Sequence, residues 1–201
     1  NGLHLTGASM SDIQYSLIPR DLEQLYSLVT RLQPGESYLL SGERRLVWQL
    51  GQELADMVAI QGPLRLILGG NRYAVDRLPI LLGDQAHRIY DVLSRIQLTR
   101  AEPAYQMLHA LETTPAQSTP IFITDFLDSF YEEALDVAEV TRLVRRCLGH
   151  MRRLNASAPL FISAALSPER PQLLELLQTH CDYQLQLYPD DQPHMRQGQL
   201  L

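Results

Sequence analysis

The sequence predicts an α/β domain with three layers, in which a mostly parallel central sheet is flanked by helices on both faces. The first observation behind this prediction is a regular alternation, from residue 37 onward, between short apolar runs and longer amphipathic stretches. The second is that the runs 121–124 and 160–163 are apolar almost throughout, as is typical of strands that helices cover on both faces. We therefore expect these two strands at the centre of the sheet.

Six strands are expected in order along the chain. The first follows the turn-forming Pro34-Gly35-Glu36, and the last, Tyr183-Gln184-Leu185-Gln186-Leu187, alternates apolar residues with glutamine. Such alternation leaves one face wetter, so the last strand is expected near an edge of the sheet. The predicted strands are 37–40, 64–68, 95–98, 121–124, 160–163 and 183–187.

The amphipathic stretches between these strands predict six helices. Pro103 and Pro168 stand where a first helical turn tolerates a missing N–H, and Ser167 is a candidate N-cap before Pro168. The predicted helices are 44–60, 75–82, 85–93, 103–112, 132–154 and 168–180. The expected divisions are an N-terminal lead-in over 1–36, a core domain over 37–188, and a C-terminal turn with a short strand or tail over 189–201.

The composition excludes several classes of function. The chain of 201 residues has a formal net charge of −6, which argues against a generally basic nucleic-acid binder, and it contains no lysine, which excludes Schiff-base catalysis. Only Cys147 and Cys181 occur, without the paired spacing of a metal site or a disulfide framework. No apolar run approaches the ~20 residues needed to span a bilayer. We therefore expect a cytoplasmic protein that is neither exported nor embedded in a membrane.

The stretch 132–154 predicts a helix with two contrasting faces. At ~100° per residue its arginines fall within about 120° of arc, opposite an apolar stripe. These arginines are Arg142, Arg145, Arg146, Arg152 and Arg153. No acidic residue occurs between Val140 and Pro168 to neutralise them. Two interpretations remain open: a solvated outer face, or a face that binds DNA or a partner protein.

Four stretches, taken in order, resemble the ATPase core of the RecA/RadA strand-exchange family, with the related KaiC-like proteins close behind. The similarity covers roughly residues 20–190 and implies a RecA-like P-loop NTPase fold. The run that ends in Ser41-Gly42 resembles the family's lead-in strand, and the run that ends in Thr124-Asp125 resembles the strand with the metal-associated aspartate. The four stretches are 34–42, 67–78, 92–106 and 120–130.

The phosphate-binding loop is the place where the chain departs most from that family. Such a loop needs glycines that turn backbone N–H groups toward the phosphates, a lysine on the β- and γ-phosphates, and a hydroxyl on Mg²⁺. Here the chain reads Ser41-Gly42-Glu43-Arg44-Arg45-Leu46, which is shorter and lacks the lysine. It also puts the carboxylate of Glu43 where it would repel a triphosphate. Gly42, Arg44 and Arg45 remain the candidate anion-binding residues of this degenerate Walker A motif.

The resemblance also leaves the chain without a catalytic residue, because Gly70 stands where active members carry the glutamate that activates water. Asp125 matches the metal-associated aspartate, and it is expected either to bind a metal or to accept hydrogen bonds from loop amides. Asp128 could share a divalent ion with it only if the loop turns back. His180 beside Cys181 is a further candidate pair, but adjacent side chains usually point apart. No cofactor is therefore expected, with ATP and Mg²⁺ as the alternative.

The resemblance and its departures together imply a catalytically inactive RecA-like protein, a pseudo-ATPase that acts through protein contacts as an accessory factor in DNA recombination or repair. Its expected partner is an active RecA-like ATPase, or further copies of itself in a homo-oligomer. One alternative is a divergent ATPase that binds phosphates through Arg44 or Arg45 and a metal through Asp125. The other is a protein that binds single-stranded DNA through the Arg142–Arg153 face.

Overall fold

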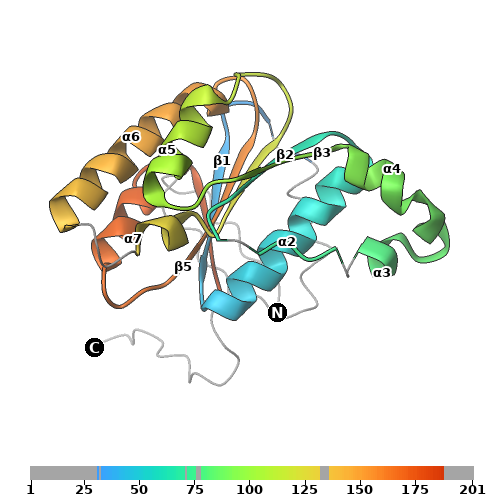
Figure 1. Cartoon of the computed structure of the whole chain (residues 1–201), viewed down its shortest axis with the longest axis horizontal. Helices are drawn as coiled ribbons and strands as arrows, with labels where there is room; N and C mark the ends of the chain where they lie inside the picture. Colours follow the sequence, from blue (N-terminus) through green and yellow to red (C-terminus); the bar gives the residue numbers. More distant parts are fainter. Residues whose placement is uncertain (1–30, 32, 71, 76–77, 132–135, 188–201) are drawn as a thin grey trace, which may run out of the picture.

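A six-stranded, all-parallel sheet lies between two layers of helices in the computed structural model, which describes residues 31, 33–70, 72–75, 78–131 and 136–187 (Figure 1). The predicted α/β class with three layers is therefore confirmed. The strands are β1 (Ser37–Gly42), β2 (Leu64–Leu68), β3 (Ile96–Arg100), β4 (Ile121–Thr124), β5 (Leu160–Ala165) and β6 (Tyr183–Leu187).

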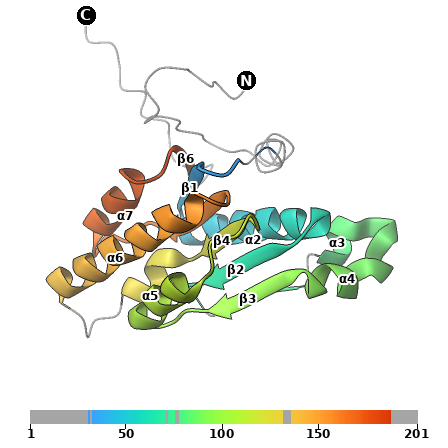
Figure 2. The same ribbon diagram turned by 90° about the horizontal axis from the view of Figure 1, so that it is seen from above.

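The strand order is β3-β2-β4-β5-β1-β6, so β4 and β5 are central and β6 is at an edge, as the hydrophobic patterns predicted. Figure 2 shows β3 and β6 on opposite sides of the molecule. The chain runs from β1 out to β2 and β3, then returns through β4 and β5 and passes β1 to reach β6. Because crossovers between parallel strands are right-handed, this reversal places the helices of the two runs on opposite faces. One face carries α2 (Arg44–Gln61), α3 (Leu78–Leu82) and α4 (Ile89–Ser94), with the 3₁₀ helix η2 (Gly83–Arg88) between the last two. The other carries α5 (Ala104–Thr113), the 3₁₀ helix η3 (Phe126–Phe130), α6 (Val137–Asn155) and α7 (Pro171–Gln178).

Alternating side chains of the central strands fill the two cores. Ile123 and Ile162 point into the core beneath α5, α6 and α7, whereas Phe122 and Phe161 point into the core beneath α2. Phe122 and Phe161 are register partners, and their rings stack with centroids 4.7 Å apart. Burial of each such ring contributes ~1.5–3 kcal/mol, and the register of β4 and β5 is therefore fixed from both faces.

Helix α6 has the two faces that the sequence predicted. The apolar side chains expected to be buried are buried: Val140, Leu143, Val144, Leu148, Met151 and Leu154. The carboxylate of Asp136 accepts a hydrogen bond from the N–H of Glu139 at 2.8 Å, and this N-cap begins the helix at Val137. The predicted start at residue 132 falls in 132–135, outside the described residues, as do the expectations for 1–30 and 189–201.

Three predicted helix starts are wrong. The helix expected over 85–93 begins as α4 at Ile89, because residues 83–88 form the 3₁₀ helix η2. The helix expected from residue 168 begins at Pro171, because Ser167 accepts from the nearby N–H of Glu169 instead of capping a helix, and a proline disfavours helical backbone in the preceding residue. The helix expected from Val75 begins at Leu78. Residues 72–75 are held against α2, where Gln52 donates to the carbonyl of Ala74 and accepts from its N–H.

Candidate functional site at the carboxyl edge of the sheet

The connection between β1 and α2 is a single residue, Glu43, between the last strand residue Gly42 and the first helical residue Arg44. The carboxylate of Glu43 accepts hydrogen bonds from the N–H groups of Arg45 and Leu46, both at 3.0 Å. These are the free amides of the first helical turn, where the helix dipole favours negative charge. A side-chain carboxylate therefore occupies the position at which a helix N-terminus would bind a phosphate.

Gly42 is a glycine for a structural reason. Its φ of 142° lies in the region that only glycine adopts easily, and a Cβ atom there would lie 2.1 Å from the carbonyl oxygen of Leu187 at the end of β6. The carbonyl of Gly42 also accepts a hydrogen bond from the N–H of Leu166, just beyond β5, at 2.8 Å. Both sides of this turn are thus in contact with neighbouring strand ends, and the backbone of Leu187 fills the space beside Gly42.

The two arginines of the turn have different surroundings. Arg44 extends across the strand ends, and its Nη1 lies 2.5 Å from Oδ2 of Asp128. Arg45 is exposed, and within the described ranges no hydrogen bond or salt bridge holds its side chain. Arg44 is therefore paired with a carboxylate of the protein itself and is not free to bind an anion at the N-terminus of α2.

The ends of β2 and β4 meet closely at the point where the strand order reverses. In open α/β sheets such a point is where ligands usually bind. Here a Cβ atom on Gly69 would lie 2.3 Å from the carbonyl oxygen of Asp125, and one on Gly70 would lie 3.2 Å from Oδ2 of Asp125. The hydroxyl of Ser129 donates to the carbonyls of Gly69 and Ala101 at 2.8 and 2.9 Å. The two glycines thus let the backbone approach Asp125, not a ligand.

Asp125 itself is buried and conformationally unusual. Its residue is 1% exposed, its φ of 51° is left-handed, and its N–H donates to Oγ of Ser163 at 3.0 Å. Oδ2 has no hydrogen-bond partner among the described residues, and the nearest cation is the guanidinium of Arg72, 4.0 Å away. Burial, and then the charge of Asp128, raise the pKa of Asp125 to about 6, against the lowering effects of Arg72 and Arg44.

Four side chains from three segments therefore form a charge cluster, which we define as Arg44, Arg72, Asp125 and Asp128. Oδ2 of Asp128 contacts both Arg44, at 2.5 Å, and Nη2 of Arg72, at 3.1 Å. The η3 turn, which begins directly after Asp125, brings Asp128 back toward the strand end. The sequence reasoning missed Arg72, although an arginine two residues after a Gly-Gly pair at a strand end is a recognisable sign.

The cluster does not suit a divalent metal. Two carboxylates are present, but two guanidinium groups lie against them, and a metal between Asp125 and Asp128 would face the positive charges of Arg44 and Arg72. In the part of the chain that the structure describes, no three side chains of His, Cys, Asp or Glu gather as a metal-binding group. The negative charges of Asp125 and Asp128 are therefore balanced by the guanidinium groups of Arg44 and Arg72.

The five arginines of α6 are all exposed, but they are not equivalent. Arg142 forms a bidentate pair with Glu139 at 2.7 and 2.9 Å, which the sequence reasoning overlooked although the two are one helical turn apart. Arg153 donates to the carbonyls of Leu111, Glu112 and Thr114, so it caps the end of α5. Arg145, Arg146 and Arg152 remain, and no salt bridge joins them to an acid of the described residues.

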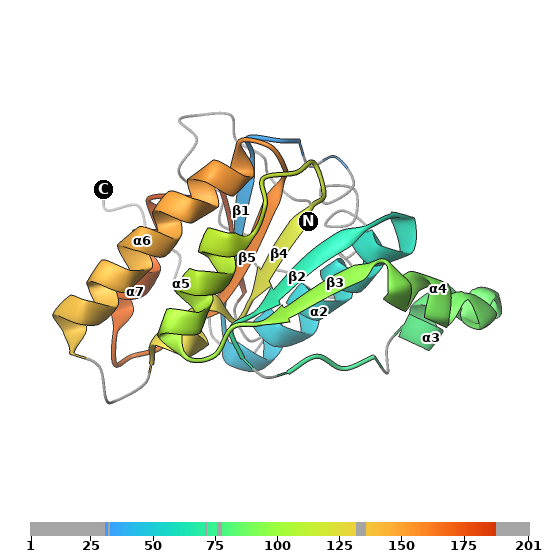
Figure 3. The same cartoon turned by 45° about the horizontal axis from the view of Figure 1, so that its top comes forward.

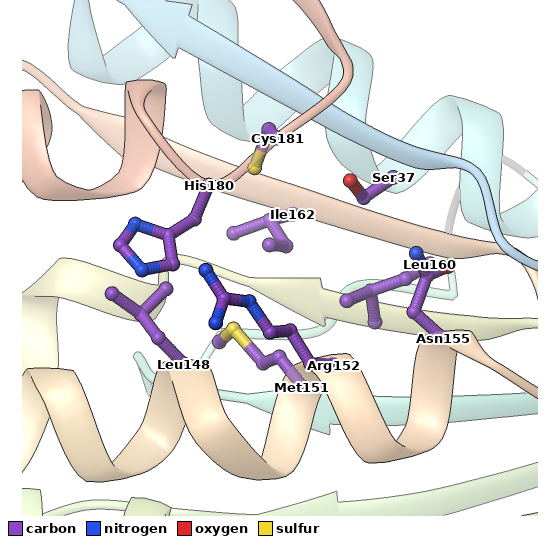
Figure 4. Close-up of a pocket in the computed structure, with 9 residues that line it drawn as sticks. All are labelled: Ser37, Leu148, Met151, Arg152, Asn155, Leu160, Ile162, His180 and Cys181. Atoms are coloured by element: carbon purple, nitrogen blue, oxygen red, sulfur yellow. The ribbon is translucent and has the colours of Figure 1, made fainter.

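A small cavity lies at the opposite, amino edge of the sheet, between α6, the starts of β1 and β5, and the segment after α7 (Figure 4). His180 and Cys181 both line it but point in different directions. Nδ1 of His180 lies 2.8 Å from the carbonyl of Leu176, and burial raises the pKa of the Cys181 thiol to about 12. The thiol therefore stays protonated at neutral pH, and this pair is not a nucleophile with its base.

Comparison of the sequence with protein-family models and with curated proteins gives no match. In the described ranges, no helix has both the length and the apolar character needed to cross a bilayer.

Proposed function

We propose that this chain is a RecA-like protein without ATPase activity, which acts through contacts with other proteins as an accessory factor in DNA recombination or repair. Its partner is an active RecA-like ATPase or further copies of the chain. We place it in the cytoplasm, where the two buried cysteines, Cys147 and Cys181, stay reduced.

The observation that carries this proposal is the position of the Glu43 carboxylate. It accepts from the N–H groups of Arg45 and Leu46, the same donors that a β- or γ-phosphate would need. A triphosphate would have to displace this carboxylate and would then be repelled by it, because two like charges about 4 Å apart repel by roughly 1–4 kcal/mol at an exposed position such as this.

The charge cluster at the ends of β2 and β4 supports the same proposal. In a working site the aspartate at the end of β4 would hold Mg²⁺, yet here Arg72 faces Asp125 and both arginines bind Asp128. The all-parallel sheet meanwhile keeps six strands, of which β1, β2, β4 and β5 are buried almost throughout. A stable scaffold without the groups for phosphate and metal is what a protein that works by contacts requires.

Titration calorimetry with ATP and Mg²⁺ tests the loss of nucleotide binding. The proposal predicts no saturable heat at millimolar nucleotide. Binding with a submillimolar dissociation constant that Asp125→Ala abolishes would instead establish the divergent ATPase.

A second experiment tests the role in contacts. The purified chain is analysed by light scattering for its mass and is used to capture RecA-like ATPases from its own cell extract. We expect either a homo-oligomer or a complex with such an ATPase. A chain that stays monomeric at high concentration and captures no such ATPase contradicts the proposal.

A further inference from the structure

We infer that the outer face of α6 binds an acidic, helical segment of a partner protein. This inference rests on the proposed function, because it names the surface through which the contacts are made. The face consists of Arg145, Arg146, Gly149 and Arg152, and it is called the arginine face below. Helix α6 lies beside α5 in its layer (Figure 3), and its arginine side is exposed to solvent.

Charge is separated sharply between α6 and the rest of the molecule. Five arginines and one glutamate give α6 a formal charge of +4, so the remaining residues of this −6 chain carry −10. Arg142 is neutralised by Glu139, and Arg153 is engaged with α5. The other three arginines are exposed, and in the described part of the chain they form no salt bridge. Of these, Arg152 lies at the margin of the face, where its side chain also lines the small cavity beside His180 (Figure 4). A partner with negative charge would therefore gain Coulomb energy without breaking an internal pair.

Gly149 is the observation that points to a helix as the bound segment. It lies in the interior of α6, where glycine costs ~0.5–1 kcal/mol relative to alanine, and the space around a Cβ placed there is empty to 4 Å. Packing within the chain therefore gives no reason for a glycine. A side chain is absent at the centre of the face, between Arg145 and Arg152, which allows a second backbone to approach closely.

The spacing of the arginines fits an opposing helix. Arg145 and Arg152 are seven residues apart, which is two turns and roughly 10 Å along the axis. Glutamates at positions i and i+7 of a partner helix would have the same separation, with small residues between them over Gly149.

A nucleic acid fits this surface less well. A phosphate backbone that extended beyond α6 would meet the exposed Glu112 of α5 and Glu175 of α7. Phosphates would also reach the tips of the arginines without needing the gap at Gly149. A short acidic helix can lie along α6 alone, so the observations favour a protein partner.

Fluorescence anisotropy with two labelled probes tests the inference. The first probe is a synthetic helical peptide with glutamates at i and i+7 and alanines at the positions between them, and the second is an oligothymidine strand. We expect the peptide to bind and its affinity to fall with salt. Arg145→Glu and Arg152→Glu should each weaken peptide binding by about tenfold or more. Arg88→Glu, with the same change of charge on the opposite layer, should leave it within about twofold.

Gly149→Gln separates binding from folding. A glutamine favours the helix and should raise the thermal midpoint, yet its side chain should weaken peptide binding by about tenfold. The inference is overturned if no peptide binds at low salt, if the three variants bind like the parent, or if oligothymidine binds more tightly through the same arginines. Calorimetry with ATP stays independent of this assay, so nucleotide binding would refute the proposed function while leaving the arginine face standing.

Discussion

Replacement of Asp125 by asparagine should stabilise the protein at neutral pH. Asp125 is 1% exposed, has an Oδ2 without a hydrogen-bond partner among the described residues, and has Arg72 no nearer than 4.0 Å. Burial outweighs the two arginines and raises its pKa from 3.8 to about 6. Asparagine removes the buried charge, and it is one of the few residues that tolerate the left-handed φ of this position.

The magnitude follows from the two pKa values. Because the folded state holds the proton more tightly than the unfolded state, the stabilising contribution is complete below pH 3.8 and is lost as the pH rises through about 6. A difference of roughly two pKa units corresponds to ~3 kcal/mol. We therefore expect the parent to lose up to ~3 kcal/mol of unfolding free energy, relative to Asp125→Asn, between pH 4 and about pH 7.

Urea unfolding of both proteins at several pH values between about 4 and 8 measures this difference. Asp128→Asn serves as the control, since Asp128 forms salt bridges with Arg44 and Arg72 and its loss should destabilise the protein at neutral pH. If Asp125→Asn is less stable than the parent at pH 7.5, the pairing with Arg72 outweighs burial and the reasoning is wrong.

Four further substitutions give distinct outcomes in thermal and urea unfolding. Gly42→Ala should cost more than ~2 kcal/mol, because its methyl group would collide with the carbonyl of Leu187, and a parent-like stability would show that the turn relaxes freely. Glu43→Ala should cost ~0.5–2 kcal/mol through loss of the cap, and an unchanged stability would mean that its carboxylate does not hold the two amides. Arg153→Ala should cost ~1–3 kcal/mol by leaving the end of α5 uncapped, whereas Arg145→Ala should stay within ~0.5 kcal/mol, and equal effects would contradict the distinction between them.

The strands could be predicted from the sequence because each is a short run in which apolar residues are either nearly continuous or alternate with polar ones. The continuous run Ile121–Thr124 predicted a strand buried on both faces, and the alternating run Tyr183–Leu187 predicted an edge, and both positions are confirmed. Local sequence is enough here because the burial of a strand is decided residue by residue.

The starts of two helices could not be read in this way. Residues 72–75 stay extended because Gln52 and Asp56, about twenty positions earlier, hold Ala74 and the hydroxyl of Tyr73 against α2. No local propensity records such contacts. At the other start, Ser167-Pro168 is a plausible helix beginning, but Pro171 three residues later competes with it and determines where α7 starts.

The candidate site was predictable in its parts but not in its arrangement. Asp125 and Arg44 were identified separately, one as a possible metal ligand and the other as a possible phosphate ligand. The contact of Arg72 with Asp128 depends on β2 and β4 being neighbours in the sheet, and the contact of Arg44 with Asp128 depends on β1 lying two positions from β4. Both placements are properties of the strand order, which the sequence does not state.

The amide groups of Arg45 and Leu46 offer the sharpest test of whether the turn after β1 can hold a nucleotide. Their resonances are followed by nuclear magnetic resonance while ATP and Mg²⁺ are added to millimolar concentration. With the Glu43 carboxylate holding both N–H groups, we predict that neither resonance shifts in a saturable way. Saturable shifts of both amides at submillimolar ATP would show that phosphate displaces Glu43. That result would contradict the proposal that this chain does not bind nucleotide.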